Sequence, residues 1–191
     1  AVLSGDEAAF LRTVDPNTPN LLAEERFWFA GLASGPLESF ELSGQPIALL
    51  DDGGLLAKIM MEYKAVADKR ETFVSLMIRL APADSGYRWA GPLFEEMEAG
   101  YFTVRYPAEY EQLAQDLWPE IEAAYRQVTS DLHIESPAPL TINLYDSPNA
   151  LRSSIALSAP DWIEGWAASE QSIKLLLRSQ AVPADYRPSL A

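Results

Sequence analysis

Apolar and polar residues alternate along two stretches in the first half of the chain. From Leu55 to Ala65 every second residue is apolar, and the stretch 72–80 repeats the pattern. A period of two residues is typical of a β-strand with one buried face. Turn-forming residues bound both stretches, at Asp51–Gly54, at the charged turn 68–70 and at Pro82–Gly86. The pattern therefore predicts two neighbouring antiparallel strands.

Two further strands and two helices are predicted around this pair. Glu38–Ser43 is a candidate strand that Gly44-Gln45-Pro46 would break, and Tyr87–Leu93 forms a third long strand. A short first helix follows a Ser or Asp cap and ends near Asp15, and a second helix is capped by Asn20 and ends by Gly35. The apolar residues of this second helix cover a broad arc, so we expect it to lie across a sheet.

Strands and helices alternate in the second half of the chain. The pattern predicts strands at 101–106, 140–145 and 173–177, a long amphipathic helix at 110–132 and a short capped helix at 150–157. Pro119 lies inside the long helix and removes one backbone hydrogen bond, at a cost of roughly 3 kcal/mol. We therefore expect the helix to kink there or to divide after Trp118.

These elements predict an α+β protein with a domain boundary near residue 99. The predicted first domain, residues 1–98, has helices packed on one face of a curved antiparallel sheet. The predicted second domain, residues 99–191, is a smaller α/β subdomain with a short sheet.

The charge of the chain limits its partners. The 191 residues include 14 Lys and Arg against 28 Asp and Glu, a net charge of −14. Nucleic acids and anionic membranes require a concentrated basic face, so we expect neither as a partner. No uncharged apolar run is long enough to span a membrane, so we expect no membrane contact from this segment.

The few metal-binding and nucleophilic side chains limit the chemistry. The absence of cysteine excludes disulfides, thiol catalysis and cysteine-ligated zinc. The single histidine, His133, follows the long predicted helix. We expect it to be satisfied locally at the helix C-terminus and not to be catalytic.

The first half resembles a known superfamily. The opening segment Ala1–Leu11, the segment Ala23–Phe29 and the strands that follow resemble a nuclear transport factor 2-like domain, the cone-shaped fold of the ketosteroid isomerase and cystatin-like superfamily. The resemblance covers roughly residues 1–98 and implies a cone whose mouth can hold a ligand or a catalytic acid–base pair. The aromatic residues that could line such a pocket, or equally form the core, are Trp28, Tyr63, Tyr87 and Trp89.

The order of elements in the second half resembles another family. The segment Asp161–Ala167 and the strand 173–177, with the preceding elements, resemble the N-terminal subdomain of a gluzincin-type (peptidase MA-like) zinc metallopeptidase. In that family the last strand is the sheet edge above the active-site cleft, and an extended substrate adds to it as a strand. The residues that the resemblance implies for substrate binding are Trp162, Gly165, Trp166, Ile173 and Leu175.

The zinc motif of that family is absent from this sequence. The His-Glu-x-x-His helix follows the edge strand in the family and binds zinc through both histidines. The segment Asp185–Ala191 resembles the approach to that helix. No catalytic or zinc-binding residue can therefore be assigned here, and zinc is implied only for a longer parent protein.

Three hypotheses follow. In the first, the chain is a non-catalytic fragment of a bacterial zinc metallopeptidase-like protein, with an accessory cone domain and the substrate-side half of the peptidase domain. This resemblance also implies an exported or membrane-anchored origin. In the second, it is a stand-alone module that binds a small apolar ligand or a protein. In the third, it is an isomerase or lyase of the ketosteroid isomerase type, which requires a buried acid among Glu24, Glu25 and Glu62.

Overall fold

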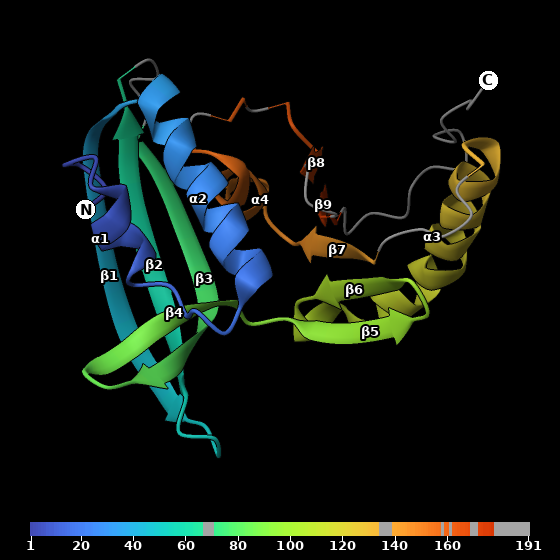
Figure 1. Cartoon of the computed structure of the whole chain (residues 1–191), viewed down its shortest axis with the longest axis horizontal. Helices are drawn as coiled ribbons and strands as arrows, with labels where there is room; N and C mark the ends of the chain where they lie inside the picture. The colour runs from blue at the N-terminus through green and yellow to red at the C-terminus, as the bar shows by residue number, and fades with distance from the viewer. Residues whose placement is uncertain (67–70, 134–138, 158, 161, 169–171, 178–191) are drawn as a thin grey trace.

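A computed structural model describes residues 1–66, 71–133, 139–157, 159, 160, 162–168 and 172–177 of the chain. These residues form a mixed α+β structure with two β-sheets, as the sequence predicts. Figure 1 shows helix α2 lying across one face of the first sheet and helix α3 packed beside the second. The predicted charged turn at 68–70 and the predicted segment 185–191 lie outside the described residues.

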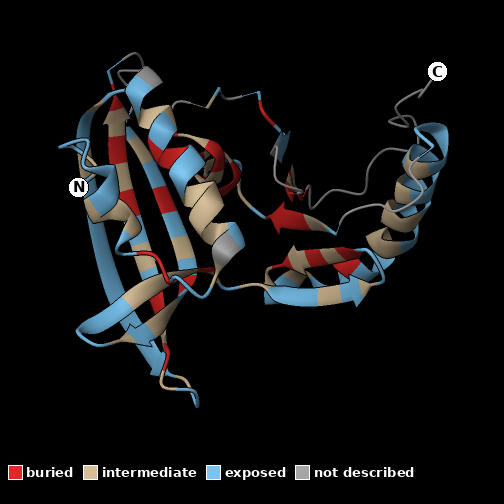
Figure 2. Ribbon diagram, viewed as in Figure 1, coloured by how far each residue is buried: buried red, intermediate tan, exposed pale blue. Residues whose placement is uncertain are grey.

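The first sheet is an antiparallel meander in the order β1-β2-β3-β4. Its strands are β1 (Leu37–Leu49), β2 (Leu55–Ala65), β3 (Glu71–Ala83) and β4 (Gly86–Pro92). The predicted alternation is confirmed, because buried and more exposed positions alternate along β2 and β3 (Figure 2). A tight turn with Gly53 in the left-handed region, at a φ of 79°, joins β1 to β2.

The predicted break in β1 is wrong, because the strand continues through Pro46. Pro46 stands opposite Ala57 of β2, and the register shifts between Pro46 and Ala48. Among the described strands β1 lies at the edge of its sheet. A proline costs no ladder hydrogen bond where its nitrogen faces the open side of an edge strand.

Helices α1 (Glu7–Leu11) and α2 (Pro19–Ser34) pack on the first sheet. Trp28 and Phe29 of α2 are buried against Met61, Tyr63 and Val74 of the sheet. The position of α2 across the sheet is therefore as predicted, and its broad apolar arc is explained by this contact.

The second sheet has the order β5-β6-β7-β9-β8. Its strands are β5 (Glu95–Ala99), β6 (Phe102–Tyr106), β7 (Leu140–Tyr145), β8 (Gly165–Ala168) and β9 (Ser172–Leu176). The three central strands are parallel, and β5 and β8 pair antiparallel at the two sides. Because β5 pairs with β6, the second sheet begins at Glu95, a few residues before the predicted boundary at 98/99.

Helix α3 (Glu111–Asp131) follows a short 3₁₀ helix, η1 (Ala108–Tyr110), and connects β6 to β7. It is continuous through Pro119, so of the two expected outcomes, a kink or a division after Trp118, the division does not occur. Its apolar residues on both sides of the proline, Leu113, Leu117, Ile121 and Tyr125, pack against the core of the second sheet. This burial outweighs the roughly 3 kcal/mol that an interior proline costs.

Helix α4 (Pro148–Ile155), in the second half of the chain, packs against the core of the first sheet. Ser147 caps it through a hydrogen bond from Ala150 N, as predicted for the short capped helix. Leu157, just after α4, lies in the same core cluster as Trp28 and Phe29 of α2. The indole Nε1 of Trp28 donates a 2.8 Å hydrogen bond to Ser153 O, a carbonyl of the last turn of α4. The residues after β7 thus complete the core of the first sheet.

Replacing Trp28 by Phe tests this connection. The variant keeps an aromatic ring beside Phe10, whose centroid lies 5.3 Å from that of Trp28. It leaves the buried Ser153 carbonyl without its donor, so we expect a loss of about 1–3 kcal/mol in the free energy of unfolding. Urea denaturation measures the loss, and Phe27→Leu, at an exposed position of α2, is the control. A loss below about 0.5 kcal/mol would show that the hydrogen bond does not hold α2 to α4.

Candidate functional site

Among the described strands, β8 forms one edge of the second sheet. Strand β9 pairs with β7 on one side and with β8 on the other. The prediction that the strand at 173–177 is the sheet edge is therefore wrong, because β8 folds back antiparallel and covers it. Ile173 and Leu175 lie in this interior strand and cannot offer backbone groups to a partner. Trp166 and Gly165 lie in β8 itself.

The backbone of β8 has one paired and one open side. Leu176 N donates to Glu164 O over 2.9 Å, and Trp166 stands opposite Lys174 in the register. In an antiparallel ladder, hydrogen-bonded and non-hydrogen-bonded residue pairs alternate along the strand. Glu164 is hydrogen-bonded to β9, so Trp166, two residues further on, also directs its N–H and C=O toward β9. Those of Gly165 and Ala167 face away from β9. Among the described residues no strand pairs with that side.

Two exposed tryptophans lie at this edge, Trp166 within β8 and Trp162 shortly before it. Trp162 is 78% exposed and Trp166 is 37% exposed. Exposed indole rings are frequent in binding surfaces because they bury a large apolar area and also offer an N–H donor. At Gly165 an added Cβ would come within 3.0 Å of Leu175 Cδ2. Glycine there allows the Leu175 side chain to lie close against β8.

The four candidate pocket aromatics lie in different environments. Trp28 and Tyr63 belong to the core beneath α2, where they are 8% and 4% exposed. Tyr87, near the start of β4, is 44% exposed, and Trp89 is half-buried. None of the four lines the large cleft that the structure contains on another side of α2.

A buried ionic cluster lies where α2, α4 and β9 meet. Lys174 Nζ is 2.7 Å from Glu24 Oε2 and donates a 2.7 Å hydrogen bond to Ser154 O. The Lys174 side chain is only 6% exposed. Lys174 and Trp28 thus donate to the neighbouring carbonyls of Ser154 and Ser153 at the C-terminus of α4. The helix dipole favours the positive charge of the lysine at this end. Tyr145 is buried beside them.

Burial and charge shift the protonation equilibria in this cluster. Burial raises the pKa of Glu25 to about 7, Lys174 lowers it and Glu24 raises it. The nearby Trp89 indole N–H lowers that pKa slightly. Burial lowers the pKa of Lys174, but Tyr145, Glu24 and Glu25 outweigh it and raise that pKa overall. Burial also raises the pKa of Tyr145.

This cluster could exchange a proton near neutral pH. The isomerase hypothesis requires one buried acid among three candidates. Glu25 is the candidate whose pKa burial raises, whereas Glu62 lies on β2 of the first sheet. Glu24 lines the large cleft and Glu25 does not. Sequence analysis identified the two acids but missed Lys174 and Tyr145. The available signal was a lysine inside an apolar run of a parallel strand, since such strands are buried on both faces.

No metal centre can be built from the described residues. They contain no group of three or more His, Cys, Asp or Glu residues that could hold a metal ion. His133 is exposed at the end of α3, with Nδ1 2.9 Å from Ser130 O, in agreement with the expected local contact. The residues present therefore do not fit the zinc that the metallopeptidase resemblance implies, and no chemical step is derived through it.

Comparisons of this chain with protein-family models, with curated proteins and with solved structures found no match. Within the part of the chain that the structure describes, no helix is long and apolar enough to cross a membrane.

Proposed function

We propose that this chain is the substrate-side part of a metallopeptidase-like protein and that β8 binds an extended peptide as an added strand. The observation that carries the proposal is the side of β8 on which no described strand pairs and to which the backbone groups of Gly165 and Ala167 point. Trp162 and Trp166 are exposed at the same edge. Peptides that add to a sheet edge gain affinity from backbone hydrogen bonds and specificity from side-chain contacts.

The arrangement of the second sheet supports this proposal. An antiparallel strand at the side of a largely parallel sheet offers an unpaired backbone that an extended chain can match. Proteins commonly protect such edges with charged side chains or proline. Gly165, Trp166 and Ala167 carry neither, so this edge is chemically suited to pairing.

We also propose that the first sheet, with α1 and α2, is an accessory domain of the nuclear transport factor 2-like type. Its support is the antiparallel meander covered on one face by helices. Because Trp28 and Tyr63 are used in its core, this domain is better suited to a structural or regulatory role than to binding a large apolar ligand.

A second candidate function is proton transfer of the ketosteroid isomerase type. The observation that favours it is the pKa of about 7 at Glu25, which suits a general base at neutral pH. Its support is weaker, because Glu25 does not reach the cleft that could admit a substrate.

Blocking the outward N–H of Ala167 tests the peptide proposal. A heptapeptide is selected on the immobilised protein from a randomised display library and labelled for fluorescence anisotropy. We expect Ala167→Pro to weaken its binding about tenfold or more, because proline removes the donor and its ring occupies the approach side. The Ala167 N–H faces away from β9, so we expect the hydrogen bonds between β8 and β9 to remain in this variant.

Ala167→Val is the matched control, because it keeps the N–H at the same position. Its affinity should stay within about threefold of that of the original chain, a difference well below the tenfold that corresponds to 1.4 kcal/mol. Equal affinities of the proline and valine variants, or the recovery of no binding peptide, would contradict strand addition at β8.

A further inference from the structure

One face of the first sheet is largely exposed along β1, β2 and β3. Buried residues such as Met61 and Val74 face α2 and the core beneath it. The residues between them point to the other side, because successive side chains of a strand lie on opposite faces. We call this side the open face, and the register assigns to it Glu41, Ser43, Gln45, Lys58, Met60, Glu62, Phe73, Ser75 and Met77.

Three large apolar side chains form a patch on the open face. Met60 is 56% exposed, Phe73 is 59% exposed and Met77 is 37% exposed. Met60 stands opposite Ser75, so Phe73 and Met77, two residues to either side of Ser75, are its diagonal neighbours. Contiguous exposed apolar side chains mark interaction surfaces, and methionine adapts its shape to a partner.

Two charged side chains frame this patch. Lys58 stands opposite Met77, and Glu62 stands opposite Phe73. They are about 14 Å apart along β2, which is too far for an ion pair with each other. Within the described part of the chain neither forms an ion pair with any other side chain. Glu62 also stands opposite Glu41 of β1, a like-charged neighbour that an added cation would offset.

The open face is complementary to a second copy of itself. Two copies can pack face to face about a two-fold axis that crosses β2 at Met60, so that their strands run antiparallel. Lys58 of each copy then meets Glu62 of the other, because both lie two residues from Met60. On β3 the same rotation brings Phe73 of each copy to Met77 of the other. One symmetry operation therefore joins opposite charges and also joins apolar side chains.

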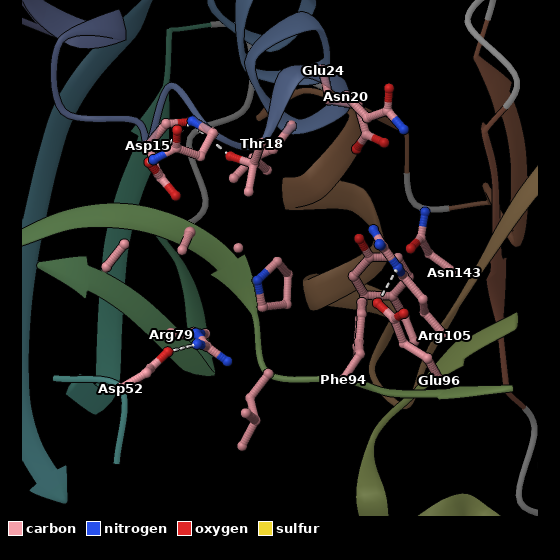
Figure 3. A pocket seen from close by; sticks show the side chains of 18 residues that line it. Asp15, Thr18, Asn20, Glu24, Asp52, Arg79, Phe94, Glu96, Arg105 and Asn143 are labelled. Carbon is pink, nitrogen blue, oxygen red and sulfur yellow. Dashed lines mark hydrogen bonds and ion pairs between the residues drawn. The ribbon is translucent and has the colours of Figure 1, made fainter. Parts of the chain in front are cut away.

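We propose that the chain forms a two-fold symmetric dimer through the open face. Met60, Phe73 and Met77 lie at its centre, and two ion pairs between Lys58 and Glu62 connect the copies. The open face shares no residue with the cleft between α2 and the second sheet (Figure 3). It also shares none with β8, so the dimer does not depend on peptide binding there.

Sedimentation velocity of the full chain tests the dimer. The net charge of −14 on each copy opposes association, so the measurement uses about 0.15 M salt, at which charges are screened beyond about 8 Å. We expect the mass to rise from the 21.1 kDa of a monomer to that of a dimer. Because the patch is small, half conversion should occur on the order of 50 µM. A monomer at all concentrations from about 5 to 500 µM would overturn the proposal.

Two charge reversals test the arrangement of the copies. Lys58→Glu alone and Glu62→Lys alone each place like charges at both ion-pair positions, so each should weaken the dimer about tenfold or more. An equimolar mixture of the two variants restores opposite charges at both positions. We expect it to form a heterodimer with an affinity within about threefold of that of the original chain.

Arg12→Glu is the matched control, because it changes the net charge as Lys58→Glu does at an exposed position after α1. Its dimer should keep an affinity within about threefold of that of the original chain. Circular dichroism checks that each variant is folded. A mixture that dimerises no better than the single variants, or equal weakening by Arg12→Glu and Lys58→Glu, would overturn the proposal.

Discussion

Replacing Lys174 by Met is expected to lower the free energy of unfolding by about 3–5 kcal/mol. Lys174 Nζ is the counter-charge of Glu24, and its side chain is 6% exposed. The methionine variant leaves Glu24 and Glu25 near each other without a cation, and it removes the donor to Ser154 O. Removing one partner of such a pair costs more than the pair contributes, because the remaining charge, here on the half-buried Glu24, stays partly desolvated without its partner.

Urea denaturation of single and double variants measures this effect. Lys58→Met, at an exposed position of β2, should change the stability by less than about 0.5 kcal/mol. Adding Glu24→Gln to Lys174→Met should recover at least 1 kcal/mol of the loss, roughly the scale of coupling between contacting residues. Strictly additive losses would show that the two side chains do not interact in solution.

The stability of the protein is expected to fall between pH 4.5 and pH 8 because of Glu25. A glutamate carboxyl group in the unfolded chain has its ordinary pKa of 4.5, whereas in the folded chain the pKa of Glu25 is about 7. The folded state therefore holds the proton more tightly, so its stabilising contribution is complete below pH 4.5 and is lost as the pH rises through 7. Each pKa unit corresponds to about 1.4 kcal/mol, so we expect a loss of about 2–3 kcal/mol after allowance for partial solvent contact.

Comparison with Glu25→Gln isolates this contribution from other titrating groups. Glutamine stays neutral, so the stability of the original chain relative to this variant should decline by that amount between pH 4.5 and 8. Glu120→Gln, at an exposed position of α3, should show no such decline relative to the original chain. A constant difference between the original chain and Glu25→Gln over this range would mean that the folded state does not raise the pKa of Glu25.

Local sequence patterns predicted the positions of the strands and helices better than the effects of the prolines inside them. The alternation from Leu55 to Ala65 was sufficient to place β2, because one face of this strand is buried over its whole length. The break predicted at Pro46 was wrong, and the helix does not divide at Pro119, because the cost of a proline depends on its surroundings. Pro46 lies in an edge strand, and the helix around Pro119 is stabilised by burial on both sides of the proline.

The candidate sites depended on contacts between distant residues. The segment around Trp166 was recognised as important, but the pairing of β8 with β9 was not predictable from either strand alone. Lys174 and Glu24 are far apart in the sequence, so their ion pair required the packing of α2 against β9.

Amide hydrogen exchange along β8 tests the proposed peptide binding most directly. With the selected peptide at saturation, NMR should show slower exchange of the Gly165 and Ala167 amides, which face outward. The Trp166 amide between them faces β9, so its exchange should change little. This alternation is specific to an added strand, because a general stabilisation of the fold would slow all three amides. Bound peptide without slower exchange at Gly165 and Ala167 would contradict the account.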